Sequence, residues 1–181
     1  MDKELYLELQ DTQWPFEYVD HHRPIARAIV YDEAGLFYFA KVDRDDAFGK
    51  GTFIETSGGG VEEGEDLLSA MQRELKEELG VSVEVICIIG VVSDYYNLIH
   101  RHNINNYFLC RAVTFGEKNL TQEEISRFHL STWKLSCEEA VREYEARADT
   151  KLGRLIANRE LPVLRRAAEI LKTMGDSGES I

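Results

Sequence analysis

The sequence has few prolines, few cysteines and no long hydrophobic run. Three prolines in 181 residues, with no repeat and no low-complexity linker, favour one continuous domain over a chain of modules. The three cysteines are odd in number and widely spaced, so they predict neither a disulfide framework nor a metal-ligand pair. We therefore expect buried free thiols in a reducing compartment.

Positive charge is also scarce, because 21 Lys and Arg stand against 33 Asp and Glu, which gives a net charge of −12. Such a surface repels nucleic-acid polymers and anionic membranes, so we expect neither as a partner. No apolar run approaches the ~18 residues of a membrane span, and the first residues do not resemble a signal peptide. We therefore expect a soluble cytoplasmic protein, in which local cations or a bound metal meet any phosphate-bearing ligand.

Hydrophobic periodicity predicts strands, a central helix, further strands and then helices. Strands are expected at residues 25–31, 36–42, 52–56, 81–92 and 106–115, and helices near 65–79, 137–147 and 152–174. This order favours an α/β fold with a mixed sheet packed between helices.

The segments between these elements carry turn residues. Residues 43–51 are charged and contain glycine, so we predict a loop there. The run Ser57-Gly58-Gly59-Gly60 is expected to break the chain, and Gly80 stands where a left-handed helix cap belongs. We predict a single domain over residues 1–181, with an N-terminal lead at 1–23, C-terminal helices at 136–175 and a frayed tail from Gly175.

Three carboxylates share one face of the central predicted helix. At ~100° per residue, Glu74, Glu77 and Glu78 fall within a sector of roughly 100°. Carboxylates three and four residues apart lie ~5–6 Å from one another, and each pair repels by on the order of 1 kcal/mol in water. A solvated acidic face is one interpretation, and an oxygen-ligand site for Mg²⁺ or Mn²⁺ is the other. The glycines before the helix favour the metal, because bare backbone can turn carbonyls toward an ion.

These residues belong to a longer pattern. Gly59, five residues, Glu65, seven residues and then Arg73-Glu74-Leu75-Lys76-Glu77-Glu78-Leu79-Gly80-Val81 resemble the signature of the Nudix hydrolases, with every fixed position matched. The resemblance covers the central part of the chain, residues 59–81. It implies an α/β/α sandwich with a mixed sheet, to which this chain would add a C-terminal helical extension. It also implies hydrolysis of the pyrophosphate bond in a nucleoside diphosphate linked to another moiety.

The resemblance further implies a metal centre. Glu74, Glu77 and Glu78 would hold Mg²⁺, with Mn²⁺ as a substitute, and the Gly58 carbonyl would be a further ligand. Divalent ions would neutralise the diphosphate and acidify the attacking water.

Two more residues acquire roles from the same resemblance. Arg73 would hydrogen-bond the carboxylates, and Glu65 would brace the preceding loop against Arg73, so both join the three glutamates as predicted catalytic residues. Ser57 is a departure, since members of the family often carry Pro before the paired glycines. We expect this difference to loosen the turn.

Outside residues 59–81, the candidate substrate-binding residues are Lys41, Arg44, Tyr95 and Tyr96. The two cations stand between a strand and a loop, where they either meet substrate phosphates or form exposed salt bridges. The tyrosines, like the run His100-Arg101-His102 that follows, either stack on a base or contact phosphate, with structural packing as the alternative.

The sequence leaves the general base open. The candidates are Glu74 and three acids after the last predicted strand, Glu117, Glu123 and Glu124, for which solvated loop acids are the alternative. The substrate is also open, and the C-terminal helices either pack on the sheet or form a homodimer contact.

Two other functions are weighed against hydrolysis. A non-catalytic nucleotide sensor would be expected to lose one of the signature carboxylates, and this chain keeps all of them. An isoprenoid diphosphate isomerase would need a reactive cysteine near the substrate, and no cysteine lies within residues 59–81. Hydrolysis is therefore the predicted function.

Overall fold

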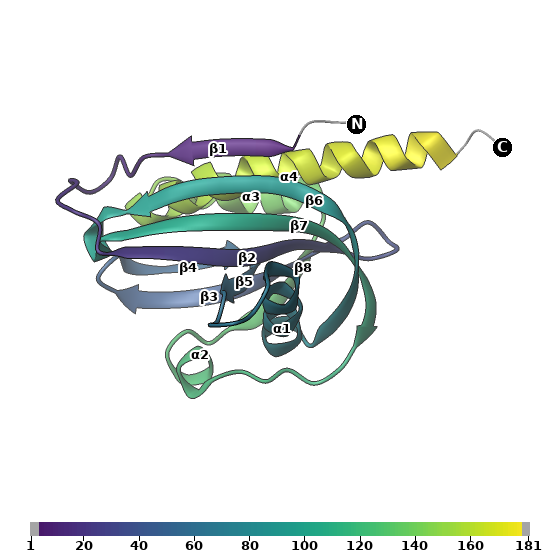
Figure 1. Cartoon of the computed structure of the whole chain (residues 1–181), viewed down its shortest axis with the longest axis horizontal. Helices are drawn as coiled ribbons and strands as arrows, with labels where there is room; N and C mark the ends of the chain where they lie inside the picture. The colour runs from purple at the N-terminus through teal and green to yellow at the C-terminus, as the bar shows by residue number, and fades with distance from the viewer. Residues whose placement is uncertain (1–3, 179–181) are drawn as a thin grey trace.

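The computed structural model describes residues 4–178, and a mixed eight-stranded sheet lies at its centre (Figure 1). The strands are β1 (Leu5–Leu9), β2 (His21–Tyr31), β3 (Phe37–Asp46), β4 (Gly49–Glu55), β5 (Ser57–Gly60), β6 (Val81–Tyr96), β7 (Arg101–Phe115) and β8 (Ser131–Leu135). Their order across the sheet is β1-β6-β7-β2-β3-β4, while β5 pairs with β2 and β8 with β3. The pairs β1/β6 and β2/β7 are parallel and the others antiparallel, so the predicted mixed sheet is confirmed.

Helices cover both faces of this sheet, which confirms the predicted α/β/α arrangement (Figure 1). The helical segments are α1 (Leu67–Leu79), the 3₁₀ turn η1 (Asn97–Ile99), α2 (Gln122–Ser126), α3 (Cys137–Arg147) and α4 (Lys151–Gly178), of which α1, α3 and α4 pack on the sheet. Ala26, Ala28 and Val30 of β2 pack with α1, whereas Ile29 packs with α3 and α4 on the opposite face. This division follows from the alternation of side chains along a strand. The C-terminal helices therefore pack on the sheet, which is the first of the two alternatives predicted for them.

The predicted central helix begins two residues later than expected. Asp66 caps its N-terminus, because its side chain accepts a hydrogen bond from the Ser69 N–H at 2.8 Å. At the other end Gly80 has φ of 66°, in the left-handed region, which confirms the predicted cap.

The prediction of a lead at residues 1–23 is wrong for the part that the structure describes. β1 pairs with β6 in parallel, and Leu5, Leu7 and Leu9 pack against the larger hydrophobic core. These leucines alternate with polar or exposed residues, which is the period of a half-buried strand. The prediction of a frayed tail from Gly175 is also wrong for residues 175–178, because α4 continues to Gly178. Residues 179–181 lie outside the described residues.

The predicted loop at residues 43–51 is a hairpin instead. β3 continues to Asp46 and β4 begins at Gly49, so only the tip turns. The charged side chains have partners across or along the strands: Arg44 pairs with Asp46 at 3.2 Å, and the Thr52 hydroxyl donates to Asp43 at 2.7 Å. Pairing of charges therefore allowed a strand where the sequence predicted a loop.

The expected chain break at Ser57-Gly58-Gly59-Gly60 is a strand. β2 and β3 pair only at Val30↔Tyr38 and Tyr31↔Phe37, and β5 pairs with the remaining part of β2, from Ile25↔Gly60 to Ala28↔Ser57. Gly58 has φ of 147°, and a Cβ there would lie 2.2 Å from the Ala26 carbonyl oxygen, so only glycine fits. Ser57 is fully buried, and the loosened turn expected from it is not found.

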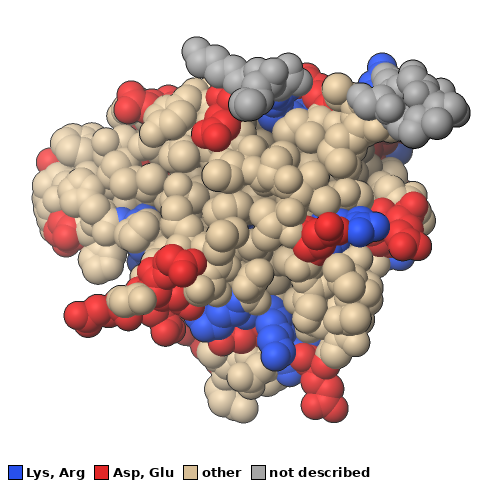
Figure 2. Space-filling view, turned by 45° about the vertical axis from the view of Figure 1, so that its right-hand side comes forward, with Lys and Arg blue, Asp and Glu red and all other residues tan. Residues whose placement is uncertain are grey.

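The cysteines carry free thiols, but only one matches the prediction of burial. Cys110 is buried, whereas Cys87 and Cys137 are partly exposed. Among residues 4–178, no helix is long and apolar enough to span a membrane. The face shown in Figure 2 carries acidic side chains at scattered points and basic ones gathered in a few clusters, in keeping with the net charge of −12.

Candidate active site

Two of the three signature glutamates of α1, Glu74 and Glu78, lie beside β5. Glu78 accepts hydrogen bonds from the Ser57 hydroxyl and, at 3.1 Å, from the Gly58 N–H. Glu74 lies against the next residue, since a Cβ on Gly59 would come within 2.3 Å of its Oε1. Bare backbone at these positions thus lets the strand approach the acidic face of the helix.

Arg73 holds this acidic face together. Its guanidinium donates to both oxygens of Glu65, at 2.9 and 3.0 Å, and to Glu74 Oε1 at 2.8 Å. It also reaches Glu77 at 3.4 Å and the Gly60 carbonyl oxygen at 3.2 Å. One cation therefore ties the loop before α1 to two of the three signature carboxylates.

Glu78 carries a partly buried carboxylate, to which Arg73 donates no hydrogen bond. Burial raises the pKa of Glu78 to about 7; the hydrogen bond from Ser57 acts in the opposite direction, and the nearby charge of Glu74 adds to the rise. Burial likewise raises the pKa of Glu74, although Arg73 opposes the shift. Within residues 4–178, no cationic side chain donates a hydrogen bond to Glu78. The exposed Lys118 interacts with it only through its charge.

These residues fit a hard divalent cation. Their side chains offer only oxygen, the donor that Mg²⁺ and Mn²⁺ prefer, and a buried carboxylate without a cationic partner is unfavourable unless a proton or a cation neutralises it. As they stand, the His, Cys, Asp and Glu side chains of residues 4–178 form no group of three or more that could hold a metal ion. In this arrangement Arg73 occupies oxygens of Glu74 and Glu77.

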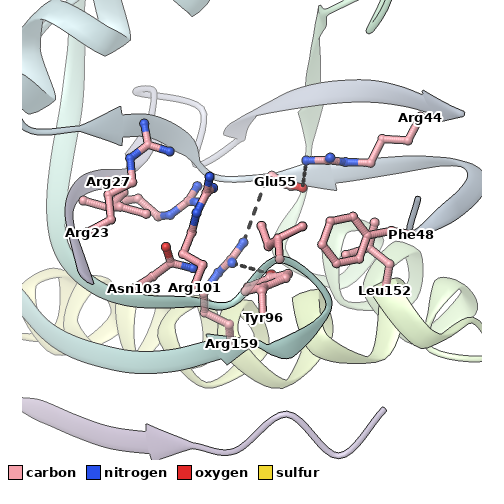
Figure 3. A pocket seen from close by; sticks show the side chains of 12 residues that line it. Arg23, Arg27, Arg44, Phe48, Glu55, Tyr96, Arg101, Asn103, Leu152 and Arg159 are labelled. Carbon is pink, nitrogen blue, oxygen red and sulfur yellow. Dashed lines mark hydrogen bonds and ion pairs between the residues drawn. The ribbon is translucent and has the colours of Figure 1, made fainter. Parts of the chain in front are cut away.

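A cavity of about 170 Å³ opens on the α4 side of the sheet (Figure 3). It is smaller than the ~300–1,000 Å³ of a typical ligand pocket, so it has room for one group of a larger ligand. The following arginines line it: Arg23, Arg27, Arg44, Arg101 and Arg159. In a protein with a net charge of −12, this is a local concentration of positive charge.

Strand register explains why these arginines meet. Arg23 and Arg27 lie four residues apart on β2, and Arg23 is level with Asn103 on β7. Arg101 lies two residues before Asn103, so alternation places all four side chains on the same face of the sheet. Arg159 approaches this face from α4.

Three of the five arginines are bound to protein groups. Arg159, which is 2% exposed, donates to the Tyr96 hydroxyl at 2.8 Å and pairs with Glu160 at 2.9 Å. Arg27 donates to the Asn105 side chain and to the Thr56 carbonyl oxygen, each at 3.0 Å.

Arg44 is held by two carboxylates. It pairs with Asp46 at 3.2 Å and with Glu55 at 3.5 Å. Burial alone would raise the pKa of Glu55, but Arg44, Arg159 and Arg27 together lower it. The three cations therefore favour the charged form of Glu55 in the wall of the cavity.

The cavity and the acidic face lie on the two sides of β5. A Cβ on Gly59 would meet Glu74, whereas a Cβ on Gly60 would lie 2.6 Å from the Arg23 guanidinium. The charge of Glu74 acts on Arg23, and the charge of Arg27 acts on Glu78. The acids and the arginines therefore form two adjacent parts of one site.

The predicted substrate-binding residues divide between this cavity and other places. Arg44 and Tyr96 line it. Tyr95 points to the other face of β6, as alternation requires, and stacks on His102 with ring centroids 4.5 Å apart. Lys41 does not line the cavity and lies over the Trp133 ring, 5.2 Å from its centroid.

The candidate bases after β7 also divide. Glu117 is exposed, and Glu123 forms an exposed ion pair with Arg127 at 2.6 Å. Glu124 is partly buried and close enough to Glu74 to help raise its pKa. It also accepts a hydrogen bond from the Thr121 N–H at 2.6 Å, which caps α2.

Sequence reasoning missed Arg23, Arg27, Arg159 and Glu55. A signal was present for Arg23 and Arg27. They stand four residues apart, so they share one face of a strand, and charged residues are out of place on a buried face. Arg159 shares one face of the predicted C-terminal helix with the apolar Leu155 and Val163, four residues before and after it, which is a similar signal. Nothing in the sequence pattern connects that helix to the strands.

Known proteins resemble this chain in sequence and in fold. A family model of the NUDIX domain matches residues 21–156. The crystal structure of a MutT protein from Methanosarcina mazei Go1 is similar with a TM-score of 0.59 and 18% identity, covering 84% of this chain and 96% of that one. A NUDIX hydrolase from Nitrosomonas europaea has a TM-score of 0.56 and 15% identity, covering 68% and 78%.

The solution structure of the E. coli ORF135 protein is also similar, with a TM-score of 0.55 and 21% identity over 84% of this chain and 91% of that one. At these identities the structural matches show likeness of fold. Comparison with curated protein sequences gives no match.

Proposed function

The chain belongs to the NUDIX family and is a hydrolase of pyrophosphate bonds, and from this premise we propose a divalent-metal-dependent enzyme. Its substrate is a nucleoside diphosphate linked to another moiety, and its cofactor is Mg²⁺, with Mn²⁺ as a substitute. The residues that hold the ion are Glu74, Glu77, Glu78 and, through its carbonyl, Gly58.

One observation carries this proposal. Within residues 4–178, the Glu78 carboxylate is partly buried near Glu74 and receives hydrogen bonds only from neutral groups, the Ser57 hydroxyl and the Gly58 N–H. Two partly buried carboxylates so placed repel one another. A divalent cation bound between them would turn this repulsion into attraction, which a merely solvated acidic face does not need.

The chemistry divides between the cation and the protein. When bound, the ion neutralises the diphosphate and lowers the pKa of the attacking water. Arg73 fixes the direction of the Glu74 and Glu77 carboxylates, and Glu65 fixes Arg73 through two hydrogen bonds. Fixed carboxylates matter because a misplacement of ~1 Å can lower the rate by about 10².

A general base must take the proton of the attacking water. Glu124 is the favoured acid among those after β7, because it is partly buried and acts on Glu74, whereas Glu117 and Glu123 are exposed. Glu74 itself is the alternative, since burial raises its pKa toward the range where a carboxylate accepts protons more readily.

A substrate panel tests the proposal. Dinucleoside polyphosphates, ADP-ribose, NADH, nucleotide sugars and nucleoside triphosphates are each incubated with the protein in millimolar Mg²⁺ and in EDTA. We expect release of a nucleoside monophosphate in Mg²⁺ only. The Glu78→Gln variant should lose most of this activity, while Glu63→Gln, which makes the same charge change at an exposed position before the helix, should keep it.

The other outcomes have distinct meanings. Binding without turnover would favour a nucleotide sensor, and rearrangement without phosphate cleavage would favour an isomerase. Activity that persists in EDTA, or in Glu78→Gln, would refute the metal site proposed here.

A further inference from the structure

Two arginines of the cavity differ from the other three. Arg27, Arg44 and Arg159 each bind protein groups, whereas within residues 4–178 no hydrogen bond or ion pair engages the side chain of Arg23 or Arg101. Figure 3 shows these two guanidinium groups close to Arg27 at one end of the cavity, away from Phe48 and Leu152.

The end of the cavity that contains Arg23 and Arg101 also holds buried polar atoms without a hydrogen-bond partner. Arg101 Nε and Asn103 Oδ1 are buried without a hydrogen-bond partner, and Asn103 is only 4% exposed. Buried polar groups are nearly always hydrogen-bonded, and each exception needs an explanation. A polar ligand would supply the missing partners.

The charges at this end point to an anion. Burial lowers the pKa of Arg23, and the positive charges of Arg101 and Arg27 lower it further. Like charges placed together away from water are unfavourable unless something of opposite sign binds them. Guanidinium groups bind phosphate through paired, charge-assisted hydrogen bonds, so two free ones suit a phosphoryl group.

This anion is distinct from the diphosphate that is cleaved. Gly59 borders Glu74 and Gly60 borders Arg23, so the acids and the free arginines lie on opposite sides of β5 at neighbouring residues. A diphosphate held at the acids would leave the arginine end free for another group of the same molecule. The cavity of about 170 Å³ has room for such a group.

We propose that Arg23 and Arg101 bind a further, uncleaved phosphate of the substrate. This inference rests on the proposed function and specifies its substrate class: nucleoside triphosphates, or diphosphates whose second moiety is itself phosphorylated. Hydrolysis of a triphosphate breaks one P–O–P bond, forms one P–O bond from water and releases nucleoside monophosphate and pyrophosphate. Nucleoside diphosphates of neutral sugars lack the group that the arginines bind.

Matched substrates test this selectivity. We compare kcat/KM for a nucleoside triphosphate and for the diphosphate sugar of the same nucleoside, in wild type, Arg23→Gln and Arg101→Gln. Both variants should lower kcat/KM for the triphosphate by about 10- to 100-fold and change it less than about threefold for the diphosphate sugar. Arg142→Gln, an exposed arginine of α3, is the matched control and should change neither.

Equal losses on both substrates would overturn the inference, because the arginines would then hold the cleaved diphosphate. No loss on either would overturn it as well.

A binding measurement separates this inference from the proposed function. Inorganic tripolyphosphate is titrated calorimetrically into the protein in EDTA, where no hydrolysis is expected. Wild type and Arg142→Gln should bind it equally, and Arg23→Gln and Arg101→Gln at least about tenfold more weakly. If no substrate is turned over, the proposed function fails while this titration still decides the inference. Absence of tripolyphosphate binding to wild type, or equal binding by all four proteins, would refute the arginine site.

Discussion

Replacing Glu78 with Gln removes a partly buried charge and keeps an oxygen for the hydrogen bonds from Ser57 and Gly58. In the metal-free protein, burial and the charge of Glu74 raise the pKa of Glu78 from its ordinary 4.5 to about 7. Folding therefore favours the protonated form of Glu78. As the pH rises from about 4.5 to about 7, the wild-type protein loses this part of its stability, because the partly buried carboxyl must become charged.

The size of the effect follows from the pKa values. A difference of 7 − 4.5, or about 2.5, corresponds to roughly 3 kcal/mol at about 1.36 kcal/mol for each unit. Hydrogen bonds to a neutral amide are weaker than those to a carboxylate by about 1 kcal/mol, which offsets part of the gain. Above pH 7, Glu78→Gln should thus be more stable by about 2 kcal/mol, which raises Tm by about 4–8 °C for a chain of this length.

Thermal melts in EDTA from pH 5 to pH 8 measure this difference. Tm of Glu78→Gln minus Tm of wild type should be near zero at pH 5 and grow toward pH 8, whereas the Glu63→Gln control should show no such trend. Saturating Mg²⁺ should then favour wild type, since a ligand at a hundred times its Kd stabilises the folded state by about 2.7 kcal/mol. A difference in Tm that does not change with pH would refute the raised pKa of Glu78.

Three further predictions concern the geometry of the site. Arg73→Ala removes the bonds to Glu65 and Glu74 and should lower kcat/KM by about 10² in steady-state assays, and unchanged kinetics would refute its positioning role. Gly59→Ala would place a Cβ within 2.3 Å of Glu74 Oε1, so Mn²⁺ affinity should fall at least about tenfold by calorimetry, and equal affinity would count against the placement of Glu74. Glu124→Gln keeps a capping oxygen yet should lower kcat by ~10²–10⁴, while Glu123→Gln should not; full activity of both would leave Glu74 as the base.

The sequence predicted the parts of the fold that depend on local pattern. The stripe of Met71, Leu75 and Leu79 placed the central helix, because its period matches the helical repeat, and Gly80 marked its end. The three glutamates could be placed beside one another for the same reason.

Pairing between distant segments could not be predicted from those patterns. Ser57 to Gly60 form a strand only because β3 diverges from β2 and leaves part of β2 free to pair. The glycines alone indicated a turn, and nothing near them in the sequence showed the vacant part of β2. Ser57 stands where family members often carry Pro, and the sequence therefore predicted a looser turn. In the fold its hydroxyl instead donates a hydrogen bond to Glu78.

The arginine cavity was missed for a related reason. Arg23 and Arg101 are 101 − 23, or 78, residues apart in sequence, and only the parallel register of β2 and β7 brings them to one face. Arg159 joins them from α4, which packs on that face. The local sequence pattern indicated Arg101 as a candidate but could not connect it to Arg23 or Arg159.

Direct measurement of Mn²⁺ binding tests the central claim that α1 and β5 hold a divalent cation. Free Mn²⁺ is followed by electron paramagnetic resonance as wild type, Glu78→Gln and Glu63→Gln are titrated in the absence of substrate. We predict saturable binding by wild type and by Glu63→Gln, competition by Mg²⁺, and at least about tenfold weaker binding by Glu78→Gln. Equal Mn²⁺ affinity of Glu78→Gln and wild type would contradict the account.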